Sequence, residues 1–295
     1  MVLQGVLVLK KSLLLCLMCS VSYNAHSSEK TCSGDMISVN AFNNFIFTQE
    51  QPFNDSLKEI NLRIKSKDDY ISNNTHAEFD GCGVLLKLKS NEVIKSQIKE
   101  NILINATDMA INKNDKIWGY KMTFKMSAVN QDGIEKNIML QKMSGKFQTD
   151  INGKINKSED TSYVLIGKDR MSAKAVTTFL IDDKDRVSES SRVSTMKNDS
   201  VNTIYSYDSK NRLIQTRSGS TIEEFTYGDD NRELSSKKVQ EFFTTETTVT
   251  TCKDWNKFGR CTDAEQDISV LIKGDKGKKD AIYNHHADIK YDYVY

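Results

Sequence analysis

Histidines and their acidic neighbours are the residues of this sequence best suited to bind a metal or to move a proton. His285 and His286 are adjacent, and Glu78 follows His76 by two residues. Adjacent side chains on a strand point to opposite faces, so the two imidazoles of the pair do not readily converge on one ion. A zinc site would need a fold that brings His76 to this pair. The sequence therefore predicts neither a metal centre nor a cofactor.

Cysteines offer a second kind of chemistry. Four of them follow residue 22, and an even number in an exported chain predicts two disulfides. Cys252 and Cys261 flank a widened turn, where facing side chains lie about 4.5–5.5 Å apart, so we expect them to be bridged. Cys32 and Cys82 then pair by elimination. No pair among these four has the C-x₂₋₄-C spacing of structural zinc sites, and a disulfide is favoured over a nucleophilic role for Cys82 beside His76.

The motifs of common enzyme classes are missing from the sequence. It has no G-x-S-x-G, no G-x-x-x-x-G-K-[ST] and no G-x-G-x-x-G. The acidic pairs at 182–183 and 229–230 fall in predicted turns, whereas a glycosidase needs two carboxylates that face each other across a cleft. We interpret the protein as non-catalytic, with an unrecognised hydrolase left open.

Five nine-residue stretches align without gaps and predict repeated β-hairpins. Position one is Phe or Tyr, position seven is Gly, Asp or Asn, and position eight is Lys or Arg. Position seven is where a tight turn needs a residue that tolerates positive φ. The pattern predicts an antiparallel meander. The stretches are FQTDINGKI at 147–155, YVLIGKDRM at 163–171, FLIDDKDRV at 179–187, YSYDSKNRL at 205–213 and FTYGDDNRE at 225–233.

Two looser copies extend the repeat. MAINKNDKI at 109–117 places Asp115 at the positive-φ position, and a stretched copy at 250–261 places Gly259 there. Asp132-Gly133 predicts a further short turn. The acid at position four and the base at position eight are expected to pair across each turn, as weak surface ion pairs.

The aromatic residues at position one are expected to lie on one face of the sheet. Alternation of side chains makes this row the core face, with an aromatic platform for sugar or peptide as the alternative. The row consists of Phe147, Tyr163, Phe179, Tyr205 and Phe225.

Exposed aromatic side chains are the candidate binding residues. We name Trp118, Trp255 and Phe258 for ligand or partner binding, because Trp255 and Phe258 lie in an insertion that a purely structural turn does not need. The opposing interpretation is that they fold back onto the edge of the sheet.

The stretch at 205–213 resembles the tyrosine–aspartate (YD) repeat of the RHS family, whose pattern is Tyr-x-Tyr-Asp-x-x-Gly-Arg-Leu. Asn211 stands where that pattern has Gly, Ile181 or Thr149 replaces the second Tyr in other copies, and Gly228 replaces the Asp. The resemblance covers about residues 147–261. It implies hairpin geometry and an extracytoplasmic setting. Six hairpins are too few for the cargo-enclosing shell of that family.

The N-terminal residues have the features of an export signal. Lys10 and Lys11 precede an apolar run at 12–21, which is shorter than the roughly 20 residues that span a bilayer. We expect a signal peptide at 1–22, a periplasmic or secreted protein, and a mature chain without a transmembrane segment. Removing residues 1–22 lowers Lys+Arg from 41 to 39 against 40 Asp+Glu, so no basic field favours nucleic acid.

The remaining chain is divided into two predicted regions. Residues 23–105 are expected to form an α+β region, in which 36–48 has strand character and 55–65 and 93–101 fit either helix or strand. Residues 106–295 are expected to form the repeat-built antiparallel sheet. The fold class is mainly β.

These observations favour an exported, non-catalytic binding or cell-envelope-associated protein whose partner is a protein, a glycan or an apolar ligand. The alternative is a periplasmic carrier, in which a curved half-barrel sheet holds a lipid or other apolar ligand. A carrier needs a concave apolar face that stays uncovered, whereas a plain binding module covers that face with a helix.

Overall fold

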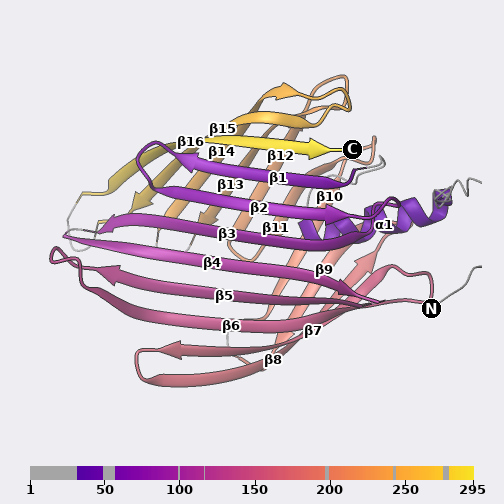
Figure 1. The fold of residues 1–295 in the computed structure, drawn as a ribbon. Coiled ribbons are helices and arrows are strands. Elements are labelled where there is room, and N and C mark those ends of the chain that lie inside the picture. Colours follow the sequence, from indigo (N-terminus) through magenta and orange to yellow (C-terminus); the bar gives the residue numbers. More distant parts are fainter. Residues whose placement is uncertain are drawn as a thin grey trace, which may run out of the picture. The chain divides into compact units, whose positions relative to one another are not determined.

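Sixteen antiparallel strands close into a barrel in the computed structural model (Figure 1). Each strand pairs with its neighbours in the sequence, and β1 pairs with β16 to complete the ring. The structure describes residues 32–48, 57–98, 100–115, 117–196, 199–241, 244–274 and 279–295. The predicted signal peptide lies outside these ranges. Within them, no helix has the length and apolar character needed to cross a membrane.

The strands are 6 to 15 residues long. The elements are α1 (Gly34–Thr48), β1 (Glu59–Ser66), β2 (Ile71–Phe79), β3 (Leu85–Ile98), β4 (Asn101–Asn114), β5 (Ile117–Val129), β6 (Glu135–Thr149), β7 (Ile155–Ile166), β8 (Asp169–Ile181), β9 (Val187–Ser194), β10 (Val201–Tyr207), β11 (Leu213–Ser218), β12 (Thr221–Tyr227), β13 (Glu233–Glu241), β14 (Thr245–Trp255), β15 (Cys261–Ile272) and β16 (Ala281–Val294).

The mainly β class and the antiparallel meander are confirmed, and the closed ring is a more specific result than either the open sheet or the half-barrel. The boundary expected between 105 and 106 falls inside β4. The described residues of 57–105 contribute β1, β2, β3 and the start of β4 to the same sheet. In the ambiguous stretches at 55–65 and 93–101, the described residues 59–65, 93–98 and 101 lie in strands, and none lies in a helix.

The repeated turns lie at one end of the barrel and have the predicted backbone. Position seven has positive φ in four of the five aligned copies, and Asp115 and Gly259 have it in the two looser ones. Hydrogen bonds to the side chain explain the preference for Asp at position four. Asp208 Oδ1 accepts hydrogen bonds from the backbone N–H groups of Lys210 and Arg212, both at 2.9 Å. The position-seven residues are Gly153, Asp185, Asn211 and Asn231.

The prediction of a repeat copy at 163–171 is wrong. Its positive φ is at Gly167 rather than at Asp169, which begins β8. The turn there is a two-residue turn at the opposite end of the barrel, so the alignment placed it two residues late. Tyr163 faces outward, whereas the other four aromatics of the predicted row face inward.

Helix α1 lies inside the ring at the end that carries the repeated turns (Figure 1). The prediction of a strand at 36–48 is wrong, because the three phenylalanines contact opposite sides of the barrel. Phe47 packs with residues of β1 to β5 and β7, and Phe42 and Phe45 pack with residues of β9 to β11. A helix presents side chains all around its axis, as a plug between two walls requires.

Asparagines and a disulfide attach the helix to the turns beside it. Asn40 and Asn44 donate hydrogen bonds to the carbonyls of Cys82 and Gly83, each at 2.8 Å. Asn43 donates to the carbonyl of Gly153 and accepts from the N–H of Ile155. The Cys32–Cys82 disulfide joins the chain two residues before the helix to the same β2–β3 turn. The helix is therefore held at several points in the mouth of the barrel.

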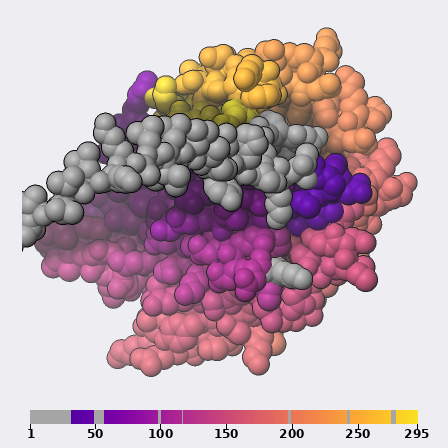
Figure 2. Space-filling view, turned by 45° about the vertical axis from the view of Figure 1, so that its right-hand side comes forward, coloured from indigo at the N-terminus to yellow at the C-terminus, as the bar shows by residue number. Residues whose placement is uncertain are grey.

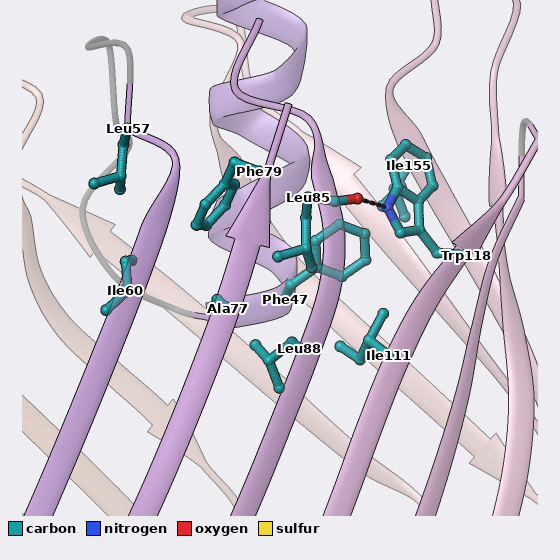
Figure 3. Packing of buried hydrophobic residues seen from close by; sticks show 10 residues of the cluster. All are labelled: Phe47, Leu57, Ile60, Ala77, Phe79, Leu85, Leu88, Ile111, Trp118 and Ile155. Atoms are coloured by element: carbon teal, nitrogen blue, oxygen red, sulfur yellow. Dashed lines mark hydrogen bonds between the residues drawn. The ribbon is translucent and has the colours of Figure 1, made fainter. Parts of the chain in front are cut away.

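The inner face near this mouth is a packed apolar core (Figure 3). Its residues alternate with outward-facing ones along each strand, and the strand register carries the same face from strand to strand. Trp118 and Phe47 lie with their ring centroids 5.3 Å apart, and Trp118 Nε1 donates to the carbonyl of Leu85 at 2.8 Å. The buried members are Phe47, Leu57, Ile60, Ala77, Phe79, Leu85, Leu88, Ile111, Trp118 and Ile155.

The outer face is rich in charged residues. Lysines and acids occupy outward positions along the middle of the strands, and several pair across neighbouring strands, as Lys87 does with Glu78 at 2.8 Å. In the space-filling view the magenta-to-pink strands form a continuous outer surface (Figure 2). A charge that faces hydrocarbon at the bilayer midplane costs about 2–4 kcal/mol. The outer face carries many charges, together with exposed apolar residues such as Leu180, Val193 and Ile204.

Candidate functional site

Position-eight arginines join neighbouring repeats around the mouth of the barrel. Arg186 forms an ion pair with Asp182 at 2.6 Å and lies 4.2 Å from the ring centre of Tyr207 in the next repeat. The hydroxyl of Tyr207 in turn donates to the carbonyl of Val187 at 2.8 Å. Arg212, Asp208 and Tyr227 repeat this arrangement one hairpin later. These contacts confirm the predicted pairing of positions four and eight at both turns.

A pocket of about 380 Å³ opens between α1 and these turns. Its floor is apolar, with Phe42, Phe45 and Leu213, and Arg186 and Asn211 lie at its border. Burial alone would raise the pKa of Asp182, but hydrogen bonds from Arg186 and the turn backbone lower it below the ordinary value. Arg186 is therefore held by a carboxylate that stays ionised, and the ion pair stabilises the turn.

Farther into the barrel, a buried polar network crosses β5, β7 and β9. The Asp160 side chain is 1% exposed and accepts hydrogen bonds from Arg192 Nη1 at 2.6 Å and Nη2 at 3.0 Å. The hydroxyl of Tyr120 donates to the same carboxylate at 2.9 Å. Burial, with the negative charge of Asp160, raises the pKa of Tyr120 above its ordinary value. The Tyr120 hydroxyl therefore stays protonated and the network is structural.

Beyond the helix, the inner face of β4 to β8 is lined with methionine. Cross-strand pairs join Met109 to Met122, Met122 to Met143 and Met126 to Met139. Six of the ten methionines in the sequence lie here. We call this surface the methionine wall; it consists of Met109, Met122, Phe124, Met126, Met139, Met143, Ile166 and Met171.

The methionine wall is not buried as a core would be. Met171 is 41% exposed and Ile166 is 43% exposed, and the other six residues are partly exposed. Side chains in a closely packed interior are almost completely covered by their neighbours. The methionine wall therefore lacks a packing partner over part of its area. Methionine is flexible and polarisable, and it adapts to ligands of varied shape.

The inner face of β11 to β14 has a different composition. Its inward positions are mostly Thr, Ser, Glu and Lys, and Glu223 lies directly across from Lys238. Burial raises the pKa of Glu223, against the opposing effect of the Lys238 charge. The inward polar residues are Thr216, Ser218, Thr221, Glu223, Ser236, Lys238, Gln240, Glu246, Thr248 and Thr250. The interior thus combines an apolar wall with a polar one.

The residues named from the sequence are distributed over the molecule. Trp118 is 5% exposed, in the core beside Phe47. Trp255 Nε1 donates to the carbonyl of Glu233 at 3.1 Å, and Phe258 packs against Tyr295 with ring centroids 4.3 Å apart. The structure does not bring the three together, and their part in binding stays a prediction.

Both predicted disulfides are present, Cys32–Cys82 and Cys252–Cys261.

The histidines lie apart, as their spacing on strands predicts. His285 faces inward and stacks on Tyr70, with ring centroids 3.6 Å apart, and its Nδ1 lies 2.5 Å from Asp68. His286 faces outward beside Asp267, and His76 lies between Asn61 and Glu78. Within the described ranges, no three His, Cys, Asp or Glu side chains are grouped so that they could hold a metal ion.

The methionine wall was missed in the sequence, although its pattern is visible there. Met122, Phe124 and Met126 alternate with polar residues, and Met139 and Met143 do so on the next strand. This alternation predicts one apolar face. Only the closed ring shows that this face is concave.

Comparisons with known proteins give little further information. No family model and no curated protein matches the sequence. Among solved structures, the chain is similar to a porin-like protein from Bacteroides uniformis ATCC 8492, with 9% identity, coverage of 81% of this chain and 98% of that one, and a TM-score of 0.43. It is also similar to the β domain of the Bordetella autotransporter BrkA, with 7% identity, coverage of 82% and 100%, and a TM-score of 0.19. Scores this low carry no argument about function.

Proposed function

We propose that this protein is a non-catalytic binding barrel that holds an apolar or amphipathic ligand against the methionine wall. The observation that carries the proposal is the partial exposure of this wall, in contrast to the buried apolar core cluster beside the helix. The proposal develops the carrier alternative, with a closed barrel in place of the half-barrel.

The two walls of the interior suit a ligand with one polar side or end. A hydrocarbon segment gains roughly 25 cal/mol for each Å² of apolar surface that it removes from water. Its polar group can be met by the hydroxyls and charges of the inward positions on β11 to β14. Ligand sites in barrels commonly combine a mostly apolar lining with a few polar groups.

An extracytoplasmic location fits this function. Two disulfides join the described cysteines, and disulfides persist mainly in oxidising compartments. The charged outer face lets the barrel stay in water while it carries an apolar load. Export and the resemblance to the YD repeat stay predictions, as does the absence of catalysis.

Fluorescent probe binding tests the proposal. The mature protein is titrated with 1-N-phenylnaphthylamine, whose emission rises in an apolar site, and a long-chain fatty acid is then added as competitor. Met171→Asp places a charge on the methionine wall at an already exposed position and should weaken probe binding at least tenfold.

The matched control is Thr178→Asp, on the same strand but on the outer face, which should leave binding unchanged. Circular dichroism melting checks that both variants fold. Failure of the wild-type protein to bind the probe, or equal weakening by both variants, would refute a ligand site on the methionine wall.

A further inference from the structure

The outer face of β5 to β8 carries a groove of about 690 Å³. Its outward residues form two rows, each crossing all four strands in register. The first row runs Lys121, Ser144, Thr161, Lys174, and the second runs Thr123, Lys142, Tyr163, Ser172. Thr195 and the intervening residues Met122, Met143, Ser162 and Ala173 complete the lining.

The groove has positive charge without a compensating acid. Its lining contains three lysines and no Asp or Glu. Several lysines elsewhere on the outer face are paired, with Lys125 and Glu135 at 2.7 Å and Lys253 and Glu265 at 2.7 Å. Among the described residues, no ion pair is formed by the three groove lysines. Uncompensated cations on a concave surface concentrate anions from solution.

We propose that this groove binds an anionic polysaccharide. Neighbouring strands are about 4.8 Å apart, so the three intervals between Lys121 and Lys174 span roughly 14 Å, which suits an extended chain with repeated carboxylate or sulfate groups. The hydroxyls of Ser144, Thr161 and Ser172 can exchange hydrogen bonds with sugar hydroxyls. Tyr163 lies between Lys142 and Ser172 in its row and offers one amphipathic ring to a sugar face.

A sugar polymer fits these residues better than a polynucleotide. Single-stranded nucleic acids bind through several aromatic side chains on which successive bases stack, and the groove has one aromatic residue. The chain as a whole is also close to neutral, with 41 basic and 40 acidic residues, so the positive charge is local to the groove.

Biolayer interferometry on immobilised polygalacturonate and heparin tests the proposal, with neutral dextran and single-stranded DNA as further surfaces. Wild-type protein should bind the two anionic polysaccharides, lose affinity as salt is raised, and ignore dextran. Lys121→Gln/Lys142→Gln/Lys174→Gln should weaken binding more than tenfold.

The matched control, Lys87→Gln/Lys125→Gln/Lys157→Gln, removes the same charge from the same face at lysines that are already paired, and should weaken binding less than threefold. Tyr163→Ala should weaken polysaccharide binding and leave the weaker binding to DNA unchanged. Equal weakening by both triple variants would overturn the groove, as would the absence of binding. DNA binding as tight as that of the polysaccharides would overturn the ligand class.

Discussion

The Asp160 network is expected to hold β5, β7 and β9 in the positions that shape the methionine wall. Its carboxylate is 1% exposed and accepts three hydrogen bonds, two from Arg192 and one from Tyr120. Asp160→Ala removes all three and leaves the Arg192 side chain, 16% exposed, with Asp199 at 3.1 Å as an acidic partner. Breaking a buried pair by removing one partner costs about 3–5 kcal/mol.

A graded set of variants separates the contributions. Tyr120→Phe removes one hydrogen bond to a charged group and should cost about 1.5–3 kcal/mol. The double variant Asp160→Leu/Arg192→Met removes both charges from the interior and should cost less than Asp160→Ala alone, because no unpaired charge stays buried.

Urea denaturation followed by circular dichroism measures each free energy of unfolding. A loss of less than about 1 kcal/mol in the free energy of unfolding for Asp160→Ala would refute the network as a structural element, because removing one partner of a buried pair is strongly destabilising. A double variant that costs the sum of the single variants would show that the two side chains do not act as a pair.

Three further predictions concern turns, disulfides and pH. Asn211→Val should cost about 1–2 kcal/mol, because Asn211 has φ of 65° and β-branched residues resist positive φ, whereas Lys210→Val in the same turn should cost little; equal melting temperatures for the two would contradict this. Loss of the Cys32–Cys82 bridge, whose cysteines are 50 residues apart, should cost about 4 kcal/mol, and loss of Cys252–Cys261, 9 residues apart, about 2–3 kcal/mol; calorimetry of the paired serine variants should give that order. Burial raises the pKa of Glu223 in the folded protein, so ionisation of this carboxyl destabilises the fold at neutral pH. Glu223→Gln should therefore raise the melting temperature at neutral pH. The gain should vanish below the ordinary pKa of 4.5, where Glu223 is protonated in both the folded and the unfolded state. A gain that is independent of pH would contradict this assignment.

The turns could be predicted from the sequence because their causes are local. Asp at position four and Gly, Asn or Asp at position seven meet the needs of four consecutive residues, and Asn211 and Gly153 have the expected backbone. The error at 163–171 has a local cause as well. Gly167-Lys168 and Asp169-Arg170 both match a turn residue followed by a base, and the predicted repeat has the second pair at positions seven and eight.

The helix and the interior could not be predicted because their causes are distant in sequence. Phe42, Phe45 and Phe47 fit either a strand or a helix by spacing, and the deciding contacts come from strands up to β11. Trp118 was named for binding because it is large and aromatic, and nothing near it in sequence shows the carbonyl of Leu85 to which it donates. The interior site depends on ring closure, which no repeat pattern encodes.

The pairing of β1 with β16 also governs how the protein folds. Every other pairing joins consecutive strands, so most of the sheet can form hairpin by hairpin from contacts close in sequence. The closing pair joins Glu59 to Val294 across almost the whole described chain. Until it forms, β1 and β16 each present a free edge, on which strands of other molecules can add. Non-local pairing is slow, so closure should limit the folding rate. Aggregation during refolding should therefore rise with concentration, and the closed ring should be free of it.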